Sequence, residues 1–95
     1  MIDTLTNHKA LENEEVIKQT VRHFLLGSIN ISELDDGDNL FELGIVNSLF
    51  AVQLMTFIEK MFGLEVERDD LDIENFKSVN ATTAFVIKKK ERLNN

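Results

Sequence analysis

Few side chains in this sequence could act as a nucleophile or as a base. Ser48 stands directly before a strongly apolar run, a setting in which its hydroxyl could do chemistry. A serine nucleophile needs a base within hydrogen-bonding distance and a third group that orients the base. The candidate bases are His8 and His23, and Gly44 to Leu49 lacks the G-x-S-x-G pattern of a nucleophile elbow. A self-contained hydrolase is therefore not expected, and no catalytic residue is assigned.

Acidic side chains gather in a segment that precedes Ser48. Asp35, Asp36, Asp38 and Glu42 are oxygen donors of the kind that Ca²⁺ prefers. Their spacing does not follow the calcium-hand loop, in which a Gly and a Glu occupy set positions. The chain has no Cys and only 2 His, so thiolate and imidazole metal sites are not expected either. The sequence predicts no dedicated metal site.

Composition limits the class of protein and its partners. The length of 95 residues and the 43% hydrophobic content fit one small globular domain, expected to be a monomer. The net charge of −7 argues against nucleic acid, and it suits either basic partner proteins or solubility alone. No run approaches the ~20 apolar residues of a membrane span. The first fifteen residues lack the apolar stretch of a signal peptide, so a cytoplasmic protein without membrane insertion is expected.

Helical periodicity begins after a loose N-terminal segment. Residues 1–12 show no sustained period and are expected to form a flexible tail, and 93–95 a short C-terminal one. Apolar residues then recur at helical spacing and predict a helix over about 13–26. Asn13 is its expected N-cap and Gly27 its expected end. The acidic connection that follows is punctuated by apolar residues, so it should pack across the core rather than project into solvent.

The run 48–62 predicts the clearest helix, with Asn47 as its N-cap and Gly63 as its end. Ten of its fifteen residues are apolar, which is more than one buried stripe needs. The inward face is predicted to consist of Val52, Met55, Ile58 and Phe62. Phe50 then lies away from that face, near Gln53 and Phe57, and is predicted to be an exposed partner contact. The alternative is that Phe50 folds back under the acidic connection and is structural, since Phe is ordinarily buried.

Two further helical segments complete the prediction. Residues 72–76 should form one or two turns, and a last helix should begin at Ser78 or Asn80 and run to about Arg92. The basic run 88–90 in its final turns is interpreted as a solvated face that complements the helix dipole. The fold class is therefore all-α, with three main helices, a short third one and a long first loop. The predicted core consists of Val16, Val21, Phe24, Leu40, Val52, Ile58, Phe62 and Phe85.

The position of Ser48 alone admits two interpretations. Asn-Ser before an apolar helix is an ordinary capping sequence, and Ser48 could simply begin the helix. A serine in the first turn, after an exposed loop, also offers its hydroxyl to an external enzyme. A phosphodiester at that point would face free backbone N–H groups and the positive end of the helix dipole.

The segment Leu40 to Leu49 resembles the attachment motif of acyl and peptidyl carrier proteins. In that family a Leu-Gly pair, a few residues and then usually Asp-Ser-Leu open the second helix. Here Leu43-Gly44 and Asn47-Ser48-Leu49 match that order, and Phe62-Gly63 closes the helix. The resemblance extends over about 13–92, the expected carrier domain. It implies a four-helix bundle without catalytic activity of its own.

The resemblance also implies a prosthetic group and partners. A phosphopantetheinyl transferase would move 4′-phosphopantetheine from coenzyme A onto Ser48, and the thiol of that arm would compensate for the absence of Cys. Val46 and Leu49 would flank the arm, and Asn47, Leu49, Phe50, Gln53 and Val46 are the expected partner-binding residues. Asn47 departs from the usual Asp. It keeps the cap but lacks the charge, so it is expected to limit which transferase acts on the chain.

The function expected from this resemblance is that of a free-standing acyl or aminoacyl carrier. Its partners would be a transferase, a loading ligase or acyltransferase, and enzymes that modify the cargo. The second helix contains one acid, Glu59, whereas housekeeping members are rich in acid there, so polyketide or nonribosomal peptide assembly is favoured. A D-alanyl or fatty-acid carrier and a helical interaction module without a prosthetic group are the alternatives.

Overall fold

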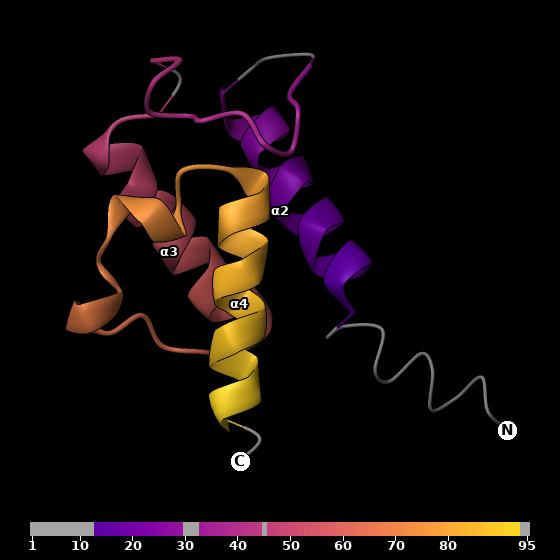
Figure 1. The fold of residues 1–95 in the computed structure, drawn as a ribbon, viewed down its shortest axis with the longest axis vertical. Helices are drawn as coiled ribbons and strands as arrows, with labels where there is room; N and C mark the ends of the chain where they lie inside the picture. Colours follow the sequence, from indigo (N-terminus) through magenta and orange to yellow (C-terminus); the bar gives the residue numbers. More distant parts are fainter. Residues whose placement is uncertain (1–12, 30–32, 45, 94–95) are drawn as a thin grey trace, which may run out of the picture.

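The computed structural model describes residues 13–29, 33–44 and 46–93 (Figure 1). It contains the α-helices α2 (Glu14–Ile29), α3 (Ser48–Phe62) and α4 (Val79–Leu93), and the 3₁₀ turns η1 (Arg68–Asp70) and η2 (Ile73–Asn75). These residues include no strand, which confirms the all-α class. The short helical segment predicted over 72–76 is present as η2, whereas η1 was not predicted. The predicted N-terminal tail lies outside the described residues.

The ends of α2 agree only in part with the prediction. Asn13 caps the helix, because its Oδ1 accepts a hydrogen bond of 2.7 Å from the Glu15 N–H. The predicted end at Gly27 is wrong, since α2 continues to Ile29. Glycine ends a helix where the backbone takes a positive φ, and Gly27 does not do so. A glycine inside a helix costs only about 1 kcal/mol relative to alanine, so Gly27 without a positive φ does not end the helix.

The limits of α3 agree with the prediction at both ends. The Phe50 N–H donates to Asn47 Oδ1 at 3.0 Å, so Asn47 is the N-cap. Gly63 takes the left-handed conformation with φ of 66°, and its N–H donates to the Glu59 carbonyl. Ser78, rather than Asn80, caps α4, because its Oγ accepts from the Ala81 N–H at 3.0 Å.

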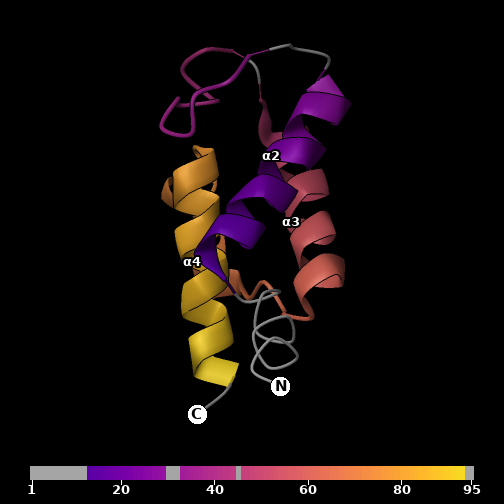
Figure 2. The ribbon, with the colours of Figure 1, turned by 90° about the vertical axis from the view of Figure 1, so that its right-hand side faces the viewer.

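The three helices enclose one apolar core. The side view shows α2 lying obliquely across α3 and α4 (Figure 2). Of the predicted core residues, those that are buried are Val21, Leu40, Ile58, Phe62 and Phe85. Val16 and Phe24 are half-buried, and the predicted burial of Val52 is wrong, since it is 55% exposed. No helix in the described part of the chain is both long and apolar enough to span a membrane.

The acidic connection packs across the helices, as predicted. Leu34 and Leu40 are buried, and the Leu40 N–H donates to the Lys77 carbonyl at 2.7 Å. Asp36 joins the connection to two helices, α2 and α4. Its carboxylate accepts from Arg22 Nη1 of α2 at 2.8 Å, and its carbonyl accepts from the Asn80 N–H of α4 at 2.9 Å.

The basic run of α4 is a structural feature, so its interpretation as a wholly solvated face is wrong. Lys89 is 5% exposed, and its Nζ donates to Glu67 Oε2 at 2.9 Å and to Asp70 Oδ2 at 2.8 Å. Lys90 Nζ donates to the Phe62 carbonyl at the end of α3. These contacts tie η1 and the end of α3 to α4.

The Lys89–Asp70 contact shifts both pKa values away from their ordinary range. Burial acts to raise the pKa of Asp70, but the hydrogen bonds from Lys89 and from the Glu67 backbone outweigh it and lower that pKa below 3.8. The hydrogen bonds to Asp70 and Glu67 raise the pKa of Lys89 above 10.5. A carboxyl group whose pKa is lowered by folding stabilises the fold at pH values above its pKa in the unfolded chain. An amine whose pKa is raised by folding stabilises the fold at pH values below its pKa in the unfolded chain. The contact is therefore fully stabilising between those two values.

Replacing Lys89 by methionine should destabilise the fold by about 1–3 kcal/mol, because the substitution leaves the largely buried Asp70 carboxylate without its cation. The difference from wild type should be greatest near neutral pH and should shrink as pH falls through the Asp70 pKa. Urea unfolding at several pH values measures this difference. Lys88→Met, at an exposed neighbouring position, is the matched control. An equal effect of the two substitutions would show that the ion pair contributes nothing.

Candidate functional site

Ser48 is exposed and is the first residue of α3. The Asn47 side chain occupies the Phe50 N–H, and the Asn47 carbonyl accepts from the Ala51 N–H at 3.0 Å. The N–H groups of Ser48 and Leu49 have no partner within the helix, because the first turn has no preceding carbonyls to bond. The Ser48 hydroxyl therefore stands where backbone donors and the helix dipole favour a negative group.

A hydrogen-bonded turn holds the chain in place just before Ser48. Asn39 Oδ1 accepts from the N–H groups of Phe41 and Glu42 at 3.1 and 3.0 Å. The Gly44 N–H donates to the Phe41 carbonyl, and Gly44 has a φ of 75°, a value that favours glycine. The Val46 N–H then donates to the Leu40 carbonyl at 3.1 Å. The turn is thus anchored to buried residues, and it delivers Asn47 and Ser48 at the surface.

An apolar pocket of about 200 Å³ opens beside Ser48. It lies between α3 and the segment that contains η2. Its lining consists of Phe41, Ser48, Ala51, Val52, Met55, Leu71, Asp72, Ile73 and Phe76. Leu71 and Ile73 are more than half exposed. Neither residue was predicted to belong to the site, although two apolar side chains among the acids of 69–74 were a signal of a surface role.

The buried face of α3 differs from the predicted one. The residues buried are Ala51, Leu54, Ile58 and Phe62, so Ile58 and Phe62 were predicted correctly, Met55 is half-buried and Val52 is exposed. Adjacent helix positions differ by about 100°, and with ten apolar residues in fifteen two neighbouring stripes have similar hydrophobicity. The directions from which α2 and α4 approach α3 decide which stripe is buried.

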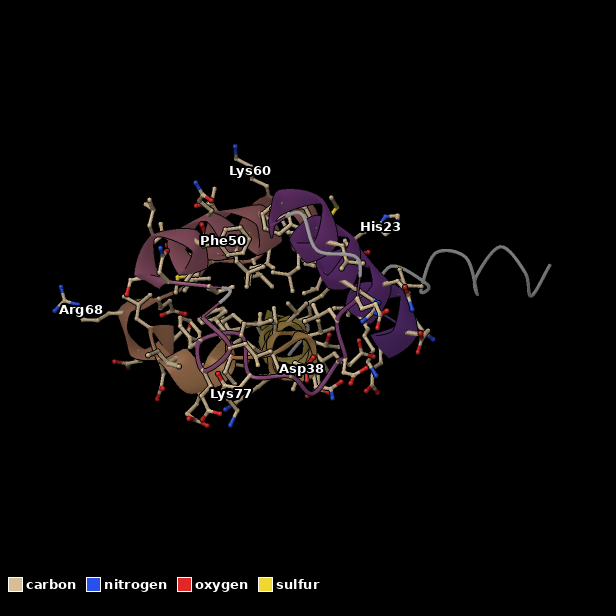
Figure 3. The ribbon with its side chains drawn as sticks, turned by 90° about the horizontal axis from the view of Figure 1, so that it is seen from above. His23, Asp38, Phe50, Lys60, Arg68 and Lys77 are labelled. Carbon is tan, nitrogen blue, oxygen red and sulfur yellow. The ribbon has the colours of Figure 1, made fainter. Side chains whose placement is uncertain are left out.

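Phe50 belongs to an aromatic cluster that joins α2 to α3. The Phe24 ring stacks on Phe57 with a centroid distance of 4.2 Å, and on Phe50 at 5.8 Å. Phe50 is half-buried and packs against the core, and Figure 3 shows its ring at α3. The predicted position of Phe50, exposed and away from the core, is wrong. The stacking with a helix distant in the sequence could not be read from the spacing within one helix.

The other predicted partner-binding residues divide into two groups. Asn47, Leu49 and Gln53 are exposed, and Leu49 is 70% exposed. Val46 is 5% exposed, so this residue is buried and does not lie on the surface, where a partner contact was expected. Its side chain is part of the core. His23 projects outward from α2 (Figure 3), and His8 lies outside the described residues.

Comparison with known families identifies the class of this site. The family model described as phosphopantetheine attachment site matches residues 15–86. The chain therefore belongs to this family, which confirms the resemblance seen in the sequence, and its prosthetic group is a covalently attached 4′-phosphopantetheine. A search of curated proteins finds no match to the sequence.

The residues around Ser48 fit that group. The exposed hydroxyl can form a phosphodiester, and the N–H groups of Ser48 and Leu49 at the start of α3 suit a phosphate. The pocket beside Ser48 offers apolar surface to whatever is attached there. The members of this family are in general carriers that do not catalyse reactions themselves.

Phe50→Ala should lower the free energy of unfolding by about 1–2 kcal/mol, less than for a fully buried Phe, because the ring is half-buried but stacked on Phe24. Thermal melts measure the change. Leu49→Ala removes an exposed side chain on the adjacent residue and should alter stability by less than about 0.5 kcal/mol. If the two variants melt together, Phe50 is not part of the α2–α3 contact in solution.

Proposed function

We propose that this chain holds acyl or aminoacyl intermediates as thioesters on a phosphopantetheine arm attached to Ser48. The observation that carries the proposal is the exposed Ser48 hydroxyl at the capped N-terminus of α3, in a chain of the phosphopantetheine attachment site family. The group supplies, when bound, a terminal thiol that forms thioesters. The remaining chemistry belongs to partner enzymes.

In the attachment step, the chain contributes a nucleophile and a binding site for phosphate. Ser48 Oγ forms a bond to the pantetheine-linked phosphorus of coenzyme A, and the bond from that phosphorus to the bridging oxygen breaks. The nucleotide leaves with that oxygen, and a base of the transferase takes the Ser48 proton. The N–H groups of Ser48 and Leu49 would hold the phosphate of the resulting phosphodiester, and the positive end of the α3 dipole would favour its charge.

The surface of α3 supports a specialised pathway, such as polyketide or nonribosomal peptide assembly. Glu59 is the only acid in α3, and its Oε2 accepts from the Val66 N–H at 2.8 Å. That acid is thus engaged within the molecule, and α3 does not present the acidic surface that housekeeping fatty-acid carriers present. A loading ligase or acyltransferase and cargo-modifying enzymes are the partners that such a pathway requires.

An intact-mass measurement tests the attachment. Incubation with coenzyme A and a broad-specificity phosphopantetheinyl transferase should add the mass of one phosphopantetheine to the wild-type protein. Ser48→Ala should gain no mass, because it lacks the Oγ nucleophile.

A gain of mass by the Ser48→Ala protein would show that the group is attached to another residue. The absence of any gain by the wild-type protein with several transferases would favour the alternative function, a helical interaction module without a prosthetic group.

Asn47→Asp should speed the attachment of phosphopantetheine to Ser48, here called loading, by a transferase whose basic surface binds an acidic residue at this position. The substitution adds a charge and keeps a good N-cap, so stability should be preserved. The gain should be greatest at low salt, where charge interactions are least screened. Loading rates against salt concentration, measured for both proteins, check this.

Asn47→Ala serves as the control for capping, and should cost about 1 kcal/mol of stability without adding charge. Equal loading rates of the wild-type and Asn47→Asp proteins at every salt concentration would mean that residue 47 does not influence the choice of transferase.

A further inference from the structure

One stripe of exposed side chains runs the length of α3 from the candidate attachment residue. Ser48, Val52, Thr56 and Lys60 follow one another at intervals of four residues, and all are exposed. Residues four apart lie on the same face of a helix. The stripe spans ~18 Å at a rise of about 1.5 Å per residue. We refer to these four residues as the α3 stripe.

An apolar depression borders the α3 stripe on each side. The pocket beside Ser48 lies toward η2 and is lined by Val52. A shallow groove of about 430 Å³ lies on the other side, between α2 and α3. Its lining consists of Phe24, Ser28, Val52, Gln53, Thr56, Phe57 and Lys60. Val52 lines both depressions, so it forms a ridge that a partner surface could cover from either side.

The charge of the α3 stripe is opposite to that of the protein. The chain carries a net charge of −7, but the charged residues of α3 are only Glu59 and Lys60. Glu59 is bonded to the Val66 N–H. Lys60 is exposed and projects outward from the helix (Figure 3), and it forms no ion pair with another residue of the described part of the chain. An enzyme that approaches Ser48 along α3 therefore meets apolar surface and one cation.

We propose that the phosphopantetheinyl transferase that loads this chain docks along the α3 stripe, with apolar side chains over Val52 and a carboxylate facing Lys60. This inference rests on the proposed attachment at Ser48. Charge complementarity determines the kind of partner, because a cluster of basic residues on the transferase would be repelled by Lys60 and would find no free acid on α3. The carboxylate would lie ~18 Å along the helix from the serine that is modified.

Lys60 also lies in the last turn of α3, where a cation complements the helix dipole. That contribution would change stability but not the loading rate of the folded protein. A kinetic measurement on variants of known stability therefore separates docking from helix stabilisation.

The experiment measures kcat/KM for loading by the transferase, among several, that modifies the wild-type protein fastest. Lys60→Glu should lower kcat/KM about five-fold at low salt, mainly through KM, and the deficit should fade at high salt. Lys88→Glu makes the same change of net charge at an exposed position of α4 and should stay within about two-fold of wild type. Val52→Asp should lower kcat/KM about ten-fold at both salt concentrations, because it places a carboxylate in the apolar contact. Thermal melts confirm that each variant is folded.

The outcomes distinguish this inference from the proposed function. A wild-type protein that no transferase loads contradicts the attachment at Ser48 itself. A wild-type protein that is loaded, together with equal rates for Lys60→Glu and Lys88→Glu, overturns the docking inference alone. Faster loading of Lys60→Glu would also overturn it, since that result requires a basic transferase surface.

Discussion

The hydrogen bond from the Phe50 N–H to Asn47 Oδ1 sets the residue at which α3 begins, and the site depends on that starting point. A shift of the helix by one residue would rotate its side chains by about 100° relative to the rest of the molecule. Leu54 and Ile58 would then leave the core, and Ser48 would no longer begin the exposed stripe. The cap and the buried face are consistent with each other. Asn47 makes Ser48 the first residue of α3, and the packing of α3 leaves Ser48 exposed to solvent.

The segments between the helices are held by a few polar contacts that each serve more than one element. Asp36 links the acidic connection to α2 through Arg22 and to α4 through Asn80. Lys89 holds Glu67 and Asp70 against α4, and the chain continues from there into Leu71 and Ile73, which line the pocket beside Ser48. The segment that lines the pocket is thus anchored to α4 by an ion pair at its η1 end. The largely buried position of that ion pair makes it less sensitive to salt than a surface pair would be.

The distribution of charge separates the acidic character of the protein from the character of its candidate site. The acids of the connection and of the segment after α3 lie off α3, and the helix itself is electrically neutral. Electrostatic steering by the whole molecule can act at long range, whereas the local contact at α3 is apolar with a single cation. A partner would therefore be attracted at long range by the net negative charge of the protein, but at α3 it would meet an apolar surface and one cation.

The sequence by itself determined the class, the family and the limits of α3. Asn47, Gly63 and the apolar run between them are local signals, because capping and glycine conformation depend on a few neighbouring residues. The tertiary structure alone decided which face of α3 is buried. The predicted Val52 is exposed and its neighbour Ala51 is buried, and the approach of α2 and α4 selects between these adjacent positions.

The difference between local signals and tertiary contacts also explains where the structure departs from the other predictions. The stacking of Phe50 on Phe24 and the burial of Lys89 against Asp70 join residues far apart in the chain. Local periodicity carries no information on such pairs. The continuation of α2 past Gly27 has a local reason, because a glycine inside a helix costs only about 1 kcal/mol relative to alanine and does not by itself end the helix.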